Sequence, residues 1–305
     1  MAPQFDVTPE KQASFPRFFY TQITFKPSVV KDVSLAGQTA IVTGSNTGVG
    51  FEVARQLLDL GLSKLILAVR NEEKGKTAQA ALSLDRNMKD ITIEVWKLDL
   101  DVYDSIVAFV ERTKSLHRLD IIVLNAGISP AERRFNEKTG HDELIQVNYL
   151  STALLAILLL PVVKATRVNQ PKPSRMTFTS SEVAAWTNFK EKNGTPLLAE
   201  LDKPGKLDMV DRMFVSKLLG QFFLNELGKR VPASVAVING ASPSSVHDSE
   251  YNREHDKTFS GAIAKKIMRR VGNRAAVGAR MVTDAAVNHG DEAHGQFYSF
   301  QKLVP

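Results

Sequence analysis

Short segments that are apolar at nearly every position alternate with helical segments along most of this chain. We expect strands at residues 39–43, 64–69, 91–98, 119–124, 175–179, 234–239 and 296–300. We expect one helix to end near residue 60 and others to span about 72–84, 103–116, 142–163 and 210–229. Strands that are apolar on both faces are typical of a parallel sheet covered by helices on both sides. The sequence therefore predicts one doubly wound α/β domain with a parallel sheet.

Residues 1–36 do not follow this alternation. They contain four prolines and no clear hydrophobic period. Proline removes a backbone donor and interrupts helices and strands. We expect this segment to be an extension that lies over the domain formed by residues 37–305.

The composition excludes several classes of site and partner. The chain has no cysteine, and its six histidines show no metal-ligand spacing, so neither disulfides nor a metal site are expected. The net charge is +6, and its densest cluster has the spacing of a solvated helix face or, as the less favoured interpretation, of a partner-binding patch. That cluster consists of Lys265, Lys266, Arg269 and Arg270. Nucleic acid is not an expected partner.

Apolar runs in the chain are too short to indicate a membrane span. The longest run, at 153–163, has eleven residues, whereas a spanning helix needs about 20. The N-terminus lacks the sustained apolar core and the cleavage site of a secretory signal. We therefore expect a cytoplasmic protein that does not bind a membrane.

A glycine-rich turn connects the first expected strand to the helix that follows it. Glycine permits a tight turn, lets the backbone approach a phosphate, and brings the helix close to the strand. The helix N-terminus then offers free N–H groups to a pyrophosphate. At the first strand-to-helix junction of an alternating chain, this pattern predicts a dinucleotide site. Its residues are Gly44, Asn46, Thr47, Gly48, Val49 and Gly50.

The spacing Gly-x-x-x-Gly-x-Gly after a threonine resembles the short-chain dehydrogenase/reductase family. Further segments match the motifs of this family in the right order, and the resemblance covers about residues 36–300. These segments are Asp99 after the third strand, Asn125-Ala126-Gly127 at the end of the fourth, Asn148 in the long helix and Ser181 after the fifth strand. The resemblance implies a Rossmann-type fold with Asp99 against the adenine and Asn125, Ala126 and Gly127 beside the cofactor.

The residue after the second strand distinguishes between the two nicotinamide cofactors. An acidic residue there would accept hydrogen bonds from the ribose of NAD, whereas an arginine accommodates the 2′-phosphate of NADP. This chain has Arg70, with Lys74 one helical turn further on. A guanidinium is a planar fork of donors that matches a phosphate group. The expected cofactor is therefore NADP(H).

The family's catalytic motif Tyr-x-x-x-Lys is incomplete in this chain. Lys217 is present, but Met213 stands at the position of the tyrosine. The resemblance implies that Asn148, Ser181 and Lys217 are the remaining catalytic residues, and that Lys217 also binds the cofactor. A thioether neither donates a proton nor takes one up near pH 7. The usual general acid, which increases the reaction rate about 10²–10⁴-fold, is therefore absent from its position.

The loop after the 234–239 strand lies on the substrate side in the family. Ser244 replaces a glycine of the family there, and His247 and Asp248 are candidates for binding substrate or for supplying the missing acid. Glu182 is a weaker candidate for the acid. Tyr149 lies about 100° around the helix from Asn148, so we expect it to pack.

The stretch between Ser181 and Lys217 is longer than in compact members of the family. Residues of about 184–209 resemble an insertion before the lysine-bearing helix, near the mouth of the active site. Trp186 in this insertion either forms an apolar substrate wall or anchors the insertion. Met213 enlarges the apolar wall of the substrate pocket. This insertion, the end of the second strand at Leu65–Asn71 and the N-terminal extension together resemble fungal reductases of secondary metabolism.

The resemblance and the missing tyrosine lead to one function hypothesis and two alternatives. The hypothesis is an NADPH-dependent reductase of a bulky apolar small molecule, with hydride transfer to an iminium or another activated carbon. The first alternative is a non-redox cyclase, isomerase or dehydratase, including a pericyclase-like enzyme, that retains NADP. The second is a catalytically silent dinucleotide-binding protein. The helix after Asn148 is apolar on more than one face, which indicates either a homodimer interface or burial within a monomer.

Overall fold

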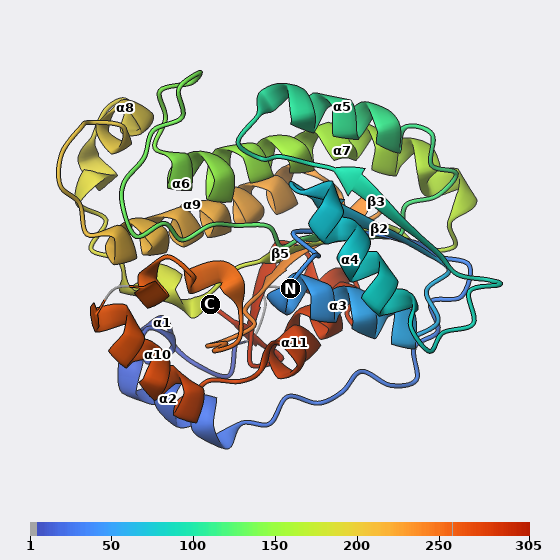
Figure 1. Ribbon diagram of the computed structural model, residues 1–305, viewed down its shortest axis with the longest axis horizontal. Coiled ribbons are helices and arrows are strands. Elements are labelled where there is room, and N and C mark those ends of the chain that lie inside the picture. Colours follow the sequence, from blue (N-terminus) through green and yellow to red (C-terminus); the bar gives the residue numbers. More distant parts are fainter. Residues whose placement is uncertain (1–4, 258) are drawn as a thin grey trace.

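The computed structural model describes residues 5–257 and 259–305, and Figure 1 shows a central sheet with helices on both faces. Within these residues the sheet has eight strands in the order β3-β2-β1-β4-β5-β6-β7-β8. β1 to β7 are parallel, and β8 pairs antiparallel with β7 at the edge. The strands are β1 Thr39–Thr43, β2 Lys64–Val69, β3 Thr92–Lys97, β4 Ile121–Leu124, β5 Ser174–Thr179, β6 Ala236–Ala241, β7 Gln296–Ser299 and β8 Lys302–Val304. This order confirms the doubly wound parallel fold that the sequence predicts.

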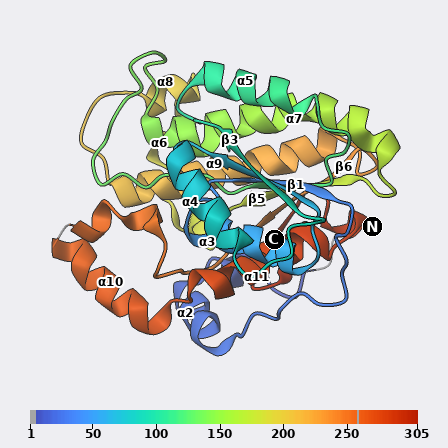
Figure 2. The same cartoon turned by 45° about the vertical axis from the view of Figure 1, so that its right-hand side comes forward.

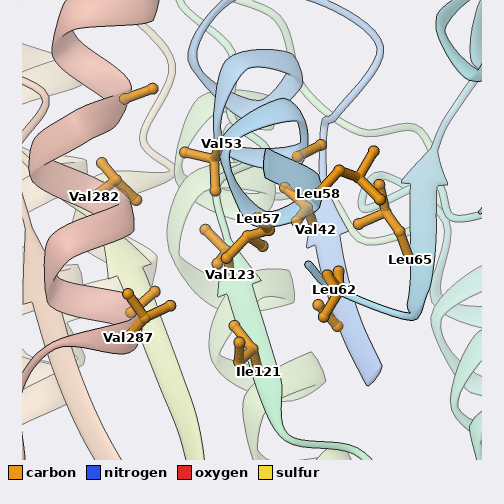
Figure 3. Close-up of a cluster of buried hydrophobic side chains, with 14 of the residues drawn as sticks. Val42, Val53, Leu57, Leu58, Leu62, Leu65, Ile121, Val123, Val282 and Val287 are labelled. Atoms are coloured by element: carbon orange, nitrogen blue, oxygen red, sulfur yellow. The ribbon is translucent and has the colours of Figure 1, made fainter. Parts of the chain in front are cut away.

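Helices cover the sheet in two layers. One layer contains α3 (Gly48–Asp59), α4 (Glu72–Ser83) and α11 (Ala275–Val287), and the other contains α5 (Tyr103–Thr113), α7 (Thr152–Thr166) and α9 (Met209–Arg230). In the first layer, Val42 of β1 packs in one buried cluster with Leu57 and Val282 (Figure 3). Ile41, the residue before Val42, belongs to the cluster on the opposite face. Because both faces of β1 are buried, its sequence shows no polar alternation.

The helix that carries Asn148 is continuous from Glu143 to Asn169. It begins as α6 (Glu143–Ile145), passes through a π-helical turn at Gln146–Ser151, and continues as α7. By length and composition this helix could cross a membrane, but 56% of its most apolar stretch is buried inside the molecule. Its apolar character is therefore explained by packing against the sheet. The π-helical turn contains Asn148, and such turns are frequent at functional sites.

Residues 5–36 contain two helices, α1 (Pro9–Gln12) and α2 (Phe15–Thr24). They were not predicted from the sequence because of its prolines. Pro9 and Pro16 stand in the first turns, where a missing N–H leaves no helical hydrogen bond unmade. Thr8 and Ser14 cap the two N-termini with their side chains. The prolines therefore begin these helices instead of interrupting them.

Helix α2 is attached to the C-terminal part of the chain. Figure 2 shows it beside α10 (Phe259–Val271). The buried Gln22 of α2 accepts a hydrogen bond of 3.1 Å from the Ser245 N–H. Its amide also donates to the carbonyl oxygens of Ser245 and Val271, at 3.4 and 3.2 Å. These bonds hold the N-terminal segment against the loop that follows β6.

The segment at 184–209 packs beside α9. It contains the end of a 3₁₀ turn at Glu182–Trp186, a second 3₁₀ turn at Lys190–Asn193, and α8 (Leu197–Leu201). The guanidinium of Arg212 on α9 is buried and lies 2.9 Å from Glu191 and 3.8 Å from Asp142. The pair with Glu191 fastens the segment to α9, one residue before Met213.

Candidate active site

A cleft of about 810 Å³ opens at the carboxyl ends of the parallel strands. The turns after β1 to β6 form its walls, which is where ligands bind in doubly wound sheets. The structure brings to this cleft most of the site residues expected from the sequence. They are Gly44, Asn46, Thr47, Val49, Arg70, Asp99, Asn125, Ala126, Gly127, Ser181, Trp186, Met213, Lys217 and Ser244.

The glycine-rich turn has the conformation that its sequence predicts. Gly44 and Gly48 have φ angles of +64° and +58°, a backbone conformation that residues other than glycine rarely adopt. A Cβ atom on Gly50 would lie 2.5 Å from the carbonyl oxygen of Gly44, so α3 packs against the turn only because residue 50 is glycine. Thr47 makes no capping hydrogen bond with its side chain. The N-terminus of α3 is therefore available to an anion in the cleft.

The segment after β4 is tied to this turn. Thr43 Oγ1 accepts hydrogen bonds of 2.9 Å from the backbone N–H groups of both Asn125 and Ala126. The Asn125 amide donates to the carbonyl oxygens of Thr43 and Gly44, at 3.0 and 3.3 Å. Asn125 thus fixes the geometry of the cleft floor.

Two cations line the end of the cleft at β2. Arg70 follows β2, and Lys74 lies in the first turns of α4. Neither side chain forms an ion pair within the described part of the chain, although surface ion pairs are frequent elsewhere in the molecule. Asp99, at the end of β3, also lines this part of the cleft and caps the N–H of Asp101 at 3.1 Å. The site therefore offers two unneutralised positive charges to a ligand.

Lys217 lines the cleft from α9, whereas the predicted Asn148 lies behind the lining, bonded to Ile128 and Tyr251, which do line it. Asn148 Oδ1 accepts a hydrogen bond of 2.8 Å from the Ile128 N–H, and its amide donates to the Ile128 carbonyl at 3.0 Å. Lys217 Nζ donates to the carbonyl oxygen of Thr179 at 3.2 Å. Burial lowers the pKa of the Lys217 ammonium to about 8.

Met213 and Ser181 complete this part of the cleft. Met213 lies one helical turn before Lys217 on the same face of α9, as their spacing of four residues predicts. Ser181 follows β5, and its Oγ accepts a hydrogen bond of 3.4 Å from the Val183 N–H. As the acceptor in that bond, the hydroxyl retains its proton for donation to a ligand.

The structure also brings into the cleft a tyrosine that lies outside all the motifs matching the family. Tyr251 is half-buried in the lining of the cleft, and its hydroxyl accepts a hydrogen bond of 3.4 Å from the Asn148 amide. Its ring centroid lies 5.7 Å from Lys217 Nζ, and its edge would meet a Cβ on Gly127 at 3.4 Å. Burial raises the pKa of this phenol. The tyrosine comes from a short 3₁₀ turn with no sequence motif, so no signal in the sequence identified it.

The segment around Tyr251 forms one wall of the cleft and is held at its far end. Glu254 pairs with Arg134 at 3.0 Å and accepts a hydrogen bond of 3.3 Å from the Ala131 N–H. Arg134 also pairs with Glu143 at 2.7 Å. These contacts fix the 249–254 segment, whose first residue lies against the glycine-rich turn: a Cβ atom on Gly48 would lie 3.0 Å from Ser249 Oγ.

Two of the expected substrate-binding residues lie outside the cleft, which corrects the sequence analysis. His247 and Asp248 line a separate hollow of about 340 Å³. Asp248 accepts a hydrogen bond of 2.6 Å from the N–H of Ala275, at the start of α11. The loop turns at Ser244, which has a φ of +56°. This turn directs Ser244 to the cleft and the two later residues away from it.

Glu182, the weaker candidate for the acid, and Tyr149 do not line the cleft either. Glu182 is fully buried between the hydroxyl groups of Ser242 and Ser299, which donate to its carboxylate at 2.5 and 2.6 Å. Burial raises its pKa. Tyr149 packs against the small apolar cluster beside α9, as expected, and burial raises the pKa of its phenol.

Fold and cleft together define an α/β protein of the dinucleotide-binding class. Residues 38–188 match the short chain dehydrogenase family. The short-chain dehydrogenase fogG of Aspergillus ruber is 42% identical over 311 aligned positions, covering 100% of this chain and 89% of the relative. The short chain dehydrogenase/reductase mfmJ of Annulohypoxylon moriforme is 39% identical and covers 98% of this chain and 87% of its own length. The chain belongs to the short-chain dehydrogenase/reductase family.

Solved structures show the same fold. RhlG of Pseudomonas aeruginosa, in an active-site complex with NADP, has a TM-score of 0.64 at 21% identity, covering 87% of this chain and 95% of its own. Salutaridine reductase of Papaver somniferum has a TM-score of 0.63 at 20% identity, covering 86% of this chain and 99% of its own.

Proposed function

We propose that this protein is an NADPH-dependent reductase of a bulky, apolar small molecule. The observation that carries the proposal is the pair of unneutralised cations, Arg70 and Lys74, in the same cleft as Ser181 and Lys217. A 2′-phosphate needs positive charge at one end of the cofactor, and hydride transfer needs a positioned substrate at the other.

The residues of the cleft fit NADP(H). Gly44 and Gly50 leave room for a pyrophosphate against the backbone, and the N-terminus of α3 faces it. Arg70 and Lys74 would hold the 2′-phosphate, Asp99 the adenosine end, and Lys217 the nicotinamide ribose. The RhlG structure was solved with NADP and a short-chain dehydrogenase of Escherichia coli CFT073 with NADPH, which supports this assignment.

The bound nicotinamide supplies a hydride, and the side chains of the cleft orient the substrate. The Ser181 hydroxyl donates a hydrogen bond to the substrate's polar atom next to the carbon that is reduced. Asn148 holds the backbone of Ile128 in place beneath this region. Met213 supplies shape and apolar contact but no proton. A substrate carbon in an iminium or another activated group suits this site best, because its reduction needs no proton from position 213.

A second candidate function is a non-redox reaction with NADP retained, such as a cyclisation, isomerisation or dehydration. The observation that favours it is the ring of Tyr251 between Gly127 and Lys217, in the space beside the lysine. A side chain there competes with the nicotinamide for its position.

NADPH oxidation separates the two functions. The purified protein is incubated with a panel of cyclic iminium ions, aromatic aldehydes and simple ketones, and the absorbance of NADPH is followed at 340 nm. The reductase predicts turnover of NADPH with the iminium ions and little with simple ketones. Product formation by mass spectrometry without NADPH turnover would instead establish the non-redox function.

We further propose a cytoplasmic homodimer that acts in the biosynthesis of a secondary metabolite. The fungal origin of relatives such as fogG and mfmJ supports the biosynthetic role. Ile157 on α7 and Phe222 on α9 are 48% and 55% exposed, which supports an interface on these two helices. Light scattering on the parent and on Phe222→Glu tests the dimer, and a parent that elutes as a monomer excludes it.

A further inference from the structure

The N-terminal helix α2 contributes aromatic side chains to the cleft that the proposed reaction does not use. Phe18 and Phe19 line the cleft together with Trp186 and Met213. The ring centroids of Phe18 and Phe19 lie 5.4 Å apart, and those of Phe18 and Trp186 lie 5.1 Å apart. Both pairs are edge-to-face, which is a preferred arrangement of packed aromatic rings.

Contacts on both sides hold the aromatic wall, which consists of Phe18, Phe19 and Trp186, in position. Trp186 Nε1 donates a hydrogen bond of 2.9 Å to the carbonyl oxygen of Ala13, and its ring lies 6.2 Å from that of Phe214. At the other end of α2, Gln22 is bonded to Ser245. The wall is therefore preorganised, which lowers the entropic cost of binding a ligand.

The wall lies at the end of the cleft where the reaction would occur. Trp186 ends the 3₁₀ turn that begins directly after Ser181, and its partner Phe214 directly follows Met213. Arg70 follows β2, which is three strand positions from β5 in the sheet, or roughly 14 Å at the usual strand spacing. The aromatic rings are therefore next to the substrate position, far from the proposed phosphate site.

We propose that Phe18, Phe19 and Trp186 form a subsite for a planar aromatic or conjugated ring of the substrate. All three side chains line the cleft; Phe19 and Trp186 are half-buried, and Phe18 is buried. A planar ring makes stacked or edge-to-face contacts with such side chains, and the thioether of Met213 makes favourable contacts with ring edges. A saturated ring of the same size fills the space without these contacts. The inference deepens the proposed function, because only that function identifies the reacting end of the cleft.

The test uses two aldehydes with the same carbon skeleton, 2-naphthaldehyde and decahydronaphthalene-2-carbaldehyde. Their dissociation constants are measured by equilibrium dialysis with the full-length parent protein, with Phe19→Leu, and with Tyr20→Leu as the matched control. Tyr20 is on the same helix but is 71% exposed and does not line this cleft. Because the side chain of leucine is also smaller than that of phenylalanine, the quantity compared is the ratio of the dissociation constants of the two aldehydes.

We expect Phe19→Leu to reduce the preference for the naphthyl ligand roughly two- to tenfold and Tyr20→Leu to leave it unchanged. A second readout is the emission of Trp186, which the naphthyl ligand should quench; the chain has only one other tryptophan, Trp96, which is buried in the core. An unchanged preference in Phe19→Leu, or an equal effect of Tyr20→Leu, overturns the inference.

NADPH oxidation on the same two aldehydes distinguishes the failure of this inference from the failure of the proposed function. If the preference for the planar ring depends on Phe19 but NADPH is oxidised neither with these aldehydes nor with the iminium ions of the panel, the subsite stands and the reductase function is wrong. If both aldehydes are reduced at rates that do not depend on Phe19, the reductase stands and the subsite is wrong.

Discussion

Lys217 carries a half-buried positive charge that no carboxylate neutralises among the described residues, so it should lower the stability of the ligand-free protein. Burial lowers its pKa from 10.5 to about 8. One pKa unit corresponds to about 1.4 kcal/mol, so the charged form costs up to roughly 3 kcal/mol. Water in the cleft reduces this cost, and Lys217→Met also removes the bond to Thr179. We therefore expect Lys217→Met to raise the free energy of unfolding by about 1–2 kcal/mol at pH 7.

The dependence on pH gives this prediction a sharper test. Between pH 8 and 10.5 the unfolded chain still binds the proton of Lys217, whereas the folded protein has released it. The free energy of unfolding of the parent should therefore rise across this window, and the advantage of Lys217→Met should shrink. Urea unfolding at several pH values measures both effects, with the exposed Lys172→Met as the control. A Lys217→Met protein that is less stable than the parent at pH 7, or whose advantage does not change up to pH 10, would refute the reasoning.

Three further predictions concern the cofactor and the reaction. Arg70→Ala should weaken NADPH binding roughly 10- to 150-fold and NADH binding little, by calorimetric titration, because it removes hydrogen bonds to a charged phosphate. Met213→Tyr should create or raise reduction of simple ketones, by up to roughly 10²–10⁴ in NADPH oxidation rate, whereas Met213→Leu should leave the native rate nearly unchanged. Tyr251→Ala should tighten NADPH binding, because it empties the space between Gly127 and Lys217; weaker binding would show that the ring supports the cofactor instead.

Much of the fold could be predicted because strands that are buried on both faces are apolar at nearly every position of the sequence. The expected strands at 39–43 and 64–69 coincide with β1 and β2, which lie in the buried part of the sheet. Helix α11 was not predicted, because it is buried along nearly its whole length and therefore lacks an amphipathic period. Helices α1 and α2 were not predicted either, because their prolines occupy first-turn positions.

The part of the site built on strand ends and glycines could be predicted, because local geometry requires those residue types. Gly44 and Gly50 are examples, since backbone conformation or close packing excludes any side chain there. Tyr251 and Phe19 could not be predicted. They reach the cleft from a short turn and from the N-terminal helix, through contacts between residues that are far apart in the sequence.

The bonds between α2 and the C-terminal part of the chain determine when the substrate wall can form during synthesis. The N–H of Ser28 donates to the Gln301 side chain across a separation of 273 residues, and the ring of Phe18 lies 5.8 Å from that of Phe300. At about 5–20 residues per second, the ribosome needs roughly 14–55 s to make the chain between them. Helix α2 therefore leaves the ribosome early with its aromatic face uncovered, and Phe300 is the last of its aromatic partners to be made. A message that ends before β7 would yield a chain in which Trp186 and Ser245 hold the substrate wall without the support of the C-terminal strands.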